Sequence, residues 1–237
     1  MPVIIKWFPR SWFQIRTADK TIYIDPAYLR TFFTKYPKKI EFTKWPDPID
    51  GLPEELERAD LILVTHDHKD HGKDVTVNRL SRADTLVIAP KRFTKKLERE
   101  VRVIEPGEEM TSGNIKIKAV EAYNTGEGSS TRKIHHKGCG VGYLVTIEGK
   151  TIYHAGDTDF IPEMRELGNV DLALLPIGGT FTMDMQEAVE EAIAIKPKTV
   201  IPMHHLKADP QKFKNRIEAR SDIKVVPLRT GGVLQLS

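Results

Sequence analysis

The sequence has very little cysteine and lacks long apolar runs. Cys139 is the only cysteine in 237 residues, which excludes an internal disulfide and favours a reducing compartment. No apolar stretch approaches the roughly 18–20 residues that span a bilayer, and the amino terminus lacks the pattern of a signal peptide. We therefore expect a cytoplasmic protein that does not enter the membrane. Linkers and low-complexity segments are also missing, which predicts one domain over residues 1–237.

The charge balance is nearly even. The formal net charge of +3 and the pI of about 8.8 are too small an excess to indicate nucleic-acid binding. Asn and Gln are sparse, whereas Lys, Arg and Glu are abundant, which is a bias of heat-adapted proteins. We therefore expect a thermostable protein, and 40% apolar residues are enough for a globular core.

Short apolar or alternating runs, separated by turn residues, predict many strands and few helices. Strands are expected over residues 3–8, 12–17, 21–25, 61–64, 85–89, 101–105, 114–123, 141–148, 151–153, 171–177, 199–203, 225–228 and 233–236. Helices are expected over residues 74–82, 91–100, 184–196 and 209–220. Strands come first in each half and helices later, which predicts an α+β fold of two sheets packed face to face with helices outside.

Two segments carry many basic residues. In residues 27–53, aromatic side chains alternate with basic residues and prolines, so this segment is either a surface loop or a lid that contacts substrate. Its Lys35, Lys38, Lys39 and Lys44 would suit a phosphorylated substrate. The basic residues of the predicted helix 91–100, among them Lys91, Arg92 and Lys96, are expected to form a solvated face.

The densest cluster of metal-ligand side chains directly follows the predicted buried strand 61–64. His66 and His68 are two residues apart in an extended stretch, so their side chains point the same way and can bind one ion. Asp70 and His71 begin a turn and can face a second ion. Imidazole and carboxylate ligands suit zinc, manganese or iron, and the lack of cysteine ligands argues against a structural zinc site. We therefore expect a metal site rather than buried core histidines.

Two later strand ends carry ligand types as well. The strand ending at His154 is followed by Gly156, which permits a sharp turn, and by Asp157, whose two carboxylate oxygens can bridge two cations. The predicted strand 199–203 leads directly into His204 and His205. Because adjacent residues of a strand face opposite ways, only one of these two histidines is expected at the site.

These motifs resemble the signature of the metallo-β-lactamase superfamily. The resemblance rests on His66-x-His68-x-Asp70-His71, on Gly156-Asp157-Thr158 and on Pro202-Met203-His204. Residues 174–179, 182–184, 196–197 and 202–204 are similar to a branch of small metal-dependent hydrolases that includes relatives of ascorbate-6-phosphate lactonases. The resemblance implies a four-layer αββα sandwich with the metals at one edge, between the two sheets.

The resemblance also implies two metal sites that share one carboxylate. Their ligands would be His66, His68, Asp70, His71, His135, Asp157 and His204. The third ligand of the first site is the open point: many family members have a histidine where this chain has Asn124, whereas closer relatives have one before a Lys-Gly pair. The second pattern matches His135, with His136 beside it. The residues left as hydrogen-bond partners of ligands or as substrate contacts are Asn124, His136, His154 and His205.

The implied activity is that of a metal-dependent hydrolase. Two divalent ions, zinc first and manganese or iron as alternatives, would hold a hydroxide that attacks an ester, lactone or phosphodiester. Asp70 and Asp157 would be the catalytic residues that hold it in line. Two alternatives remain at this point: a non-catalytic protein whose metal stabilises an assembly or a sensing site, and a nuclease of the same superfamily. The expected partner is a small molecule, which a phosphate group would suit; nucleic acid is disfavoured and a homo-oligomer is left open.

Overall fold

The computed structural model describes residues 2–27 and 56–236. The loop or lid predicted over residues 27–53 therefore lies, apart from Ala27, outside the described residues. The same holds for its four lysines, Lys35, Lys38, Lys39 and Lys44.

The first sheet contains seven strands among the described residues, in the order β14-β1-β2-β3-β4-β5-β6. They are β1 (Val3–Trp7), β2 (Phe13–Arg16), β3 (Thr21–Ile24), β4 (Ala59–Leu63), β5 (Ser81–Ala89), β6 (Arg102–Val103) and β14 (Val233–Leu236). Strands β14, β1, β2 and β3 pair antiparallel, and β3 through β6 run parallel. The parallel part therefore gathers the carboxyl ends of β3 and β4 at one edge.

The second sheet also has seven strands in the described ranges, in the order β13-β12-β11-β10-β9-β8-β7. They are β7 (Glu109–Ser112), β8 (Ile115–Glu121), β9 (Val141–Ile147), β10 (Lys150–His154), β11 (Leu172–Pro176), β12 (Thr199–Met203) and β13 (Lys224–Val225). Strands β10 through β13 run parallel, whereas β7 through β10 pair antiparallel. Strands β10, β11 and β12 consequently end at one edge.

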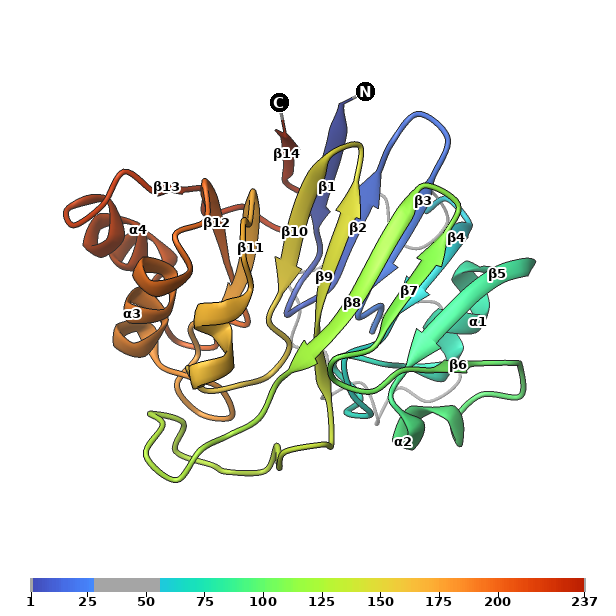
Figure 1. The fold of residues 1–237 in the computed structure, drawn as a ribbon, viewed down its shortest axis with the longest axis horizontal. Coiled ribbons are helices and arrows are strands. Elements are labelled where there is room, and N and C mark those ends of the chain that lie inside the picture. Colours follow the sequence, from blue (N-terminus) through green and yellow to red (C-terminus); the bar gives the residue numbers. More distant parts are fainter. Residues whose placement is uncertain (1, 28–55, 237) are drawn as a thin grey trace, which may run out of the picture.

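The two sheets face each other and helices lie outside them (Figure 1). The helical segments are α1 (Asp74–Leu80), α2 (Lys91–Thr94), the 3-10 helix η3 (Pro162–Glu166), α3 (Met185–Ile195) and α4 (Pro210–Glu218). A second core cluster, on the outer face of the first sheet, joins Ile62 and Val64 to Val77 of α1 and Phe93 of α2. Strand β4 is thus covered on both faces, as its apolar run predicts, and the expected αββα sandwich is confirmed.

Several predicted elements differ from the structure. The helix expected over residues 91–100 ends at Thr94, because Lys96 N and Leu97 N bond to carbonyls three residues back and the chain turns toward β5. There the Arg99 Nη2 donates to the carbonyl oxygens of Arg82 and Thr85. The segments 225–228 and 233–236 do not close one sheet: β13 borders the second sheet and β14 the first. Strand β7 and the 3-10 helix η3 were not predicted, and Ser81 and Arg82, expected in a helix, begin β5.

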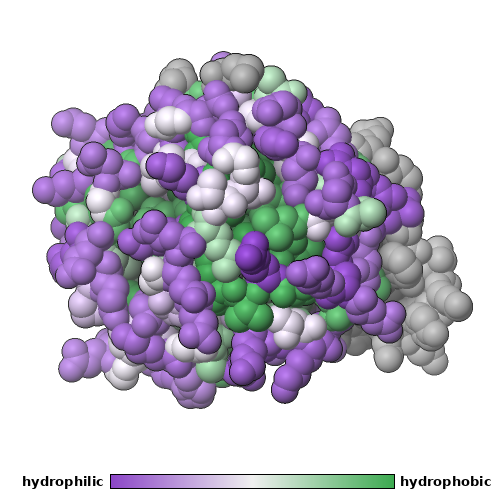
Figure 2. Space-filling model, turned by 45° about the vertical axis from the view of Figure 1, so that its right-hand side comes forward, coloured by the Kyte–Doolittle hydropathy of each residue, from purple (hydrophilic) through white to green (hydrophobic). Residues whose placement is uncertain are grey.

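The surface is largely hydrophilic. Figure 2, in which the right-hand side of Figure 1 is turned forward, shows hydrophilic side chains around an apolar area in the middle of the view. Within the described ranges, the helices are too short and too polar to cross a bilayer. The single-domain organisation stays a prediction.

Candidate metal centre

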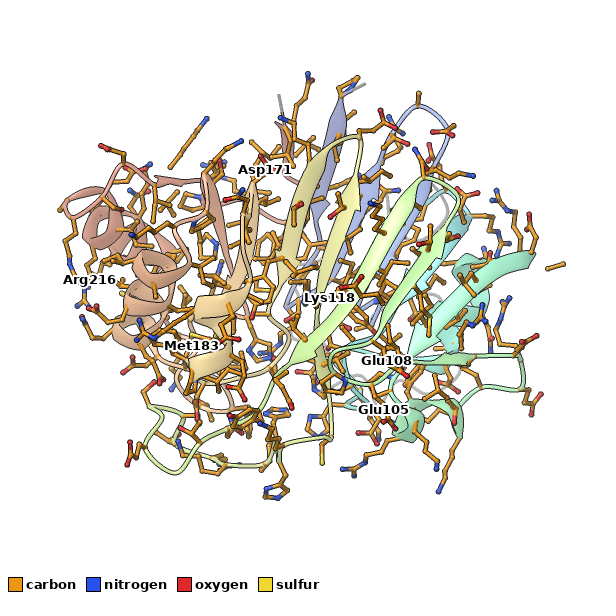
Figure 3. All side chains as sticks on the ribbon, in the orientation of Figure 1. Glu105, Glu108, Lys118, Asp171, Met183 and Arg216 are labelled. Carbon is orange, nitrogen blue, oxygen red and sulfur yellow. The ribbon has the colours of Figure 1, made fainter. Side chains whose placement is uncertain are left out.

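The expected ligands and one further aspartate, Asp25, lie where strands of both sheets end. Asp25 follows β3, the stretch from Thr65 to His71 follows β4, Asp157 follows β10 and His204 follows β12. Figure 3 shows which edge of the second sheet this is. Asp171, just before β11, lies at the upper edge, and Met183, after that strand, lies near the lower edge, so β11 ends at the lower edge. The long connection between β8 and β9 passes the same lower edge (Figure 1) and brings in His135.

One set of three side chains, called here the first group, consists of His66, His68 and His135. The His68 Nδ1 lies 3.1 Å from the His66 Nε2 and 3.1 Å from the His135 Nε2. Nitrogens that share a tetrahedral zinc at 2.0–2.1 Å lie about 3.3 Å apart. The three rings are therefore spaced as ligands of one ion, and the structure favours His135 over Asn124 and His136 as the third.

A second set, called here the second group, consists of Asp70, His71 and His204. The His204 Nε2 lies 3.6 Å from the Asp70 Oδ2. His204 adopts a left-handed backbone conformation, with φ of +48°, directly after β12. A residue other than glycine pays about 1–3 kcal/mol for such a conformation, and strained positions of this kind cluster at functional sites.

Asp157 lies between the two groups. Its Oδ1 is 3.2 Å from the His71 Nε2, and its Oδ2 is 3.4 Å from the His135 Nε2 and 3.7 Å from the His204 Nε2. Gly156, with φ of +69°, makes the turn that exposes this carboxylate; a Cβ there would lie 2.9 Å from the Val141 carbonyl oxygen. One carboxylate therefore faces both groups, which is the arrangement that a bridging ligand requires.

Asp25, which the sequence analysis did not single out, fixes two of the histidine rings. Its Oδ2 accepts from the His71 Nδ1 at 2.7 Å and from the Thr65 hydroxyl at 2.7 Å. The same hydroxyl lies 2.9 Å from the His66 Nδ1 and can accept its proton. The Nε2 lone pairs of His66 and His71 are thereby left for an ion. The only sequence signal was an acidic residue at a strand end, before a proline.

The loop that carries His135 is held by Asn124 and Asp159. The Asn124 Oδ1 accepts from the His135 backbone N at 3.0 Å and lies 3.2 Å from its Nδ1, which is also 3.0 Å from the Phe181 carbonyl oxygen. The buried Asp159 accepts from the backbone N of Thr125 and of Ser130 and pairs with the Lys133 Nζ at 3.1 Å. Asn124 thus orients the ring of His135, a candidate ligand, and Asp159, which was not singled out either, shapes the loop.

The buried charged groups at the centre shift one another's pKa values. Burial alone would raise the pKa of the Asp157 carboxyl, but His204 and His71 hold it well below its usual value. Burial would likewise lower the pKa of His71, but Asp157 and Asp25 raise it well above 6.5. Burial lowers the pKa of His66 and of His135. Before an ion binds, the second group therefore holds a proton on His71, while His66 and His135 are neutral.

Several buried polar atoms at this centre make no hydrogen bond within the described part of the protein, although the His71 Nε2 and the Asp157 Oδ1 face each other at 3.2 Å as an ion pair. Among the described residues, the His71 Nε2, the Asp157 Oδ1 and the His204 Nε2 are buried without a hydrogen bond. Buried polar groups are almost always satisfied, so such atoms require an unseen partner. Their identity as imidazole nitrogens and a carboxylate oxygen fits a divalent metal ion.

A cavity of about 50 Å³ opens onto the centre. It is lined by His66, His68, His135 and Asp157, and also by Arg92, Ile134 and Cys139. This space is enough for a water molecule. A larger cavity of about 730 Å³ lies at the other end of the first sheet, against Arg16, Asp60 and Arg82, and no histidine lines it.

The remaining histidine candidates lie apart from the ligand atoms. The buried His154 Nε2 bonds to the Ser11 carbonyl oxygen at 2.8 Å, and its Nδ1 accepts from the Gly156 N. The His205 Nε2 bonds to the Pro202 carbonyl oxygen at 2.7 Å, and its ring packs against Trp7. His136 is exposed. His154 thus supports the turn before Asp157, whereas His205 and His136 do not join either group.

Comparisons with known proteins agree with the αββα fold and with a metal-dependent hydrolase. A family model described as a β-lactamase superfamily domain matches residues 4–204. A UPF0173 metal-dependent hydrolase of Anoxybacillus flavithermus is 35% identical over 94% of this chain and 95% of its own length. One from Pyrococcus abyssi is 32% identical over 99% of this chain and 100% of its own. The solved structure of Igni18, a metallo hydrolase from the hyperthermophilic archaeon Ignicoccus hospitalis, is 25% identical with a TM-score of 0.76, covering 100% and 99% of the two chains.

Proposed function

We propose that this chain, which belongs to the β-lactamase superfamily and is a metal-dependent hydrolase, uses two divalent ions to hydrolyse an ester, lactone or phosphodiester. The observation that supports two ions is the position of Asp157, whose oxygens face the first and the second group. His66, His68 and His135 would hold one ion, Asp70, His71 and His204 the other, and Asp157 both.

Bound at these positions, such ions supply Lewis acidity: they lower the pKa of a water ligand toward neutrality and polarise the oxygen of the electrophile. The protein contributes fixed acceptors. Burial would raise the pKa of Asp70, but the nearby His204 and His71 lower it below its usual value. Asp70 and Asp157 therefore stay ionised and can accept a hydrogen bond from the nucleophile, which fixes its direction of attack.

Zinc is our first choice of metal, because every donor is an imidazole or a carboxylate and the only cysteine, Cys139, is outside both groups. Manganese and iron fit the same donors. The cavity beside the ligands supports a catalytic rather than a structural site, since structural zinc sites are closed by four protein ligands. A cytoplasmic location, thermostability and a homo-oligomer stay predictions from the sequence.

The test combines metal analysis with turnover. Protein purified without chelator should contain two metal ions per chain and should hydrolyse at least one member of a panel of lactones, phosphodiesters (RNA included) and thioesters. The variant Asp157→Ala should lose both ions and fall to background activity. Asp171→Ala is the matched control, because it removes an ion-paired aspartate at the opposite end of the same sheet. Unchanged metal content in Asp157→Ala would refute the bridging role.

A further inference from the structure

Arg92 of helix α2 reaches the rim of the metal centre. We propose that its guanidinium binds an anionic group of the substrate, a carboxylate or a phosphate, next to the scissile bond. This inference rests on the proposed hydrolase function and adds the substrate's charge to it. Arg92 was expected on a solvated face; it is exposed, yet it also lines the cavity that His66, His68 and Asp157 share.

The position of Arg92 is set from both sides. Phe93, the next residue, is fully buried in the core cluster outside the first sheet, which anchors α2. On the other side, the Arg92 Nη1 donates to the Cys139 Sγ at 3.0 Å. The following residue, Gly140, packs so closely on His66 that a Cβ would lie 3.0 Å from the His66 Cβ. The guanidinium therefore lies between α2 and the loop that carries His135, beside the first group.

The positive charge of Arg92 is only partly compensated. Its Nε lies 4.0 Å from the Asp67 Oδ1, and the Lys96 Nζ lies 3.9 Å from the Asp67 Oδ2. Two cations thus share one carboxylate. A guanidinium has five N–H donors in a planar fork, and a thiol is a weak acceptor. Among the described residues, Cys139 accepts the only hydrogen bond from Arg92. Most of the fork is free to bind a carboxylate or phosphate in the bidentate manner that arginine favours.

The size of the cavity limits where the anion can lie. A volume of about 50 Å³ holds the nucleophile and little more, so the rest of the substrate must extend outward. Ile134, on the rim, is 45% exposed and offers an apolar contact for a short spacer. The geometry therefore points to a substrate whose anionic group is a few bonds from its scissile carbonyl or phosphoryl group.

The kinetic test compares two esters of similar size, neutral 4-nitrophenyl butyrate and anionic mono-4-nitrophenyl succinate. Arg92→Gln should lower kcat/KM for the succinate ester about ten- to hundredfold, the usual value of a charged hydrogen-bonded contact, and leave the butyrate ester within about twofold. Arg92→Lys, which keeps the charge and loses the fork, should fall in between. Lys91→Gln removes the neighbouring charge of α2, which is not part of the cavity lining, and should change neither ester. An equal loss on both esters overturns the proposal.

The single cysteine gives a second readout that needs no turnover. The rate at which neutral N-ethylmaleimide modifies Cys139 is measured on the metal-loaded protein with increasing succinate or, separately, inorganic phosphate. Either anion should slow the modification of Cys139 in the parent protein and in Lys91→Gln. In Arg92→Gln, an anion concentration about tenfold higher should be needed for the same protection. The anion that protects at the lower concentration identifies the preferred group.

These two readouts separate this proposal from the proposed function. If an anion protects Cys139 only when Arg92 is present, and the protein hydrolyses neither ester, the anion site is supported and the proposed hydrolysis of such esters is not. Equal protection of the parent protein and Arg92→Gln overturns the anion site, even if both esters are hydrolysed.

Discussion

The second group is built from strand ends and buried contacts, whereas the first group takes its third member from a loop. His71 and His204 follow β4 and β12, are essentially inaccessible to solvent, and His71 is fixed by a 2.7 Å hydrogen bond to Asp25. His135 comes from the connection between β8 and β9, and its loop is held by Asn124 and Asp159. We therefore expect the two ions to differ in affinity, and the ion of the first group to be lost more readily.

Among changes outside the proposed ligands, the largest effect is expected from Asp25→Asn. The carboxylate that accepts from the His71 Nδ1 would be replaced by a weaker acceptor that also carries a donor. Loss of such a partner usually weakens metal binding 10- to 100-fold. The second group should lose that much affinity in a competitive titration with a chelator. The first group, which Asp25 reaches only through Thr65, should lose less than about tenfold.

Asp60→Asn is the control, because Asp25 accepts from the Thr65 N and Asp60 likewise accepts from the Thr21 N, but Asp60 lies at the opposite end of β3 and β4. If Asp25→Asn weakened both groups equally, Thr65 would couple them and the two groups would have to be treated as one.

A smaller effect, confined to the first group, is expected from Asp159→Asn. This change removes the ion pair with Lys133 and loosens the loop that presents His135, so metal content should fall from two ions toward one when a mild chelator is present. Asp171→Asn breaks an ion pair of similar length, with Lys198, far from the centre (Figure 3). The Asp159→Asn protein should lose about 1–3 kcal/mol of stability as well, but only this variant should lose metal. Metal loss from the second group in Asp159→Asn would contradict the expected difference between the two groups.

The same contrast explains what the sequence could predict. The stretch from His66 to His71, with Asp157 and His204, could be proposed as a ligand set from the sequence, because these residues come after strands whose apolar runs are plain. His135 could be selected only through the resemblance, because its loop has no strand or helix pattern and is held by tertiary hydrogen bonds to Asn124 and Asp159.

Asp25 could not be identified from the sequence for a related reason. It lies 40 residues before Thr65 and 46 before His71, and only the parallel pairing of β3 with β4 brings it to them. The length of the helix after Pro90 was overestimated because a charged sequence fits a helix, whereas Arg99 draws the chain back toward β5.

The smallest effect, and the sharpest distinction between the groups, is the pH dependence of metal binding. Asp157 and Asp25 raise the pKa of His71 well above 6.5, so metal-free protein holds a proton there that an ion must displace. As the pH rises from 6.5 to that raised pKa, the affinity of the second group should rise about tenfold per unit, and it should level off above it. The pKa values of His66 and His135 are lowered by burial, so these two side chains should add no slope to metal binding by the first group in this window. Calorimetric titrations at pH 7, in two buffers of different ionisation enthalpy, should therefore show proton release for one of the two ions. Equal release from both ions would contradict the contrast between the groups, because it would place the displaced proton on a ligand that they share.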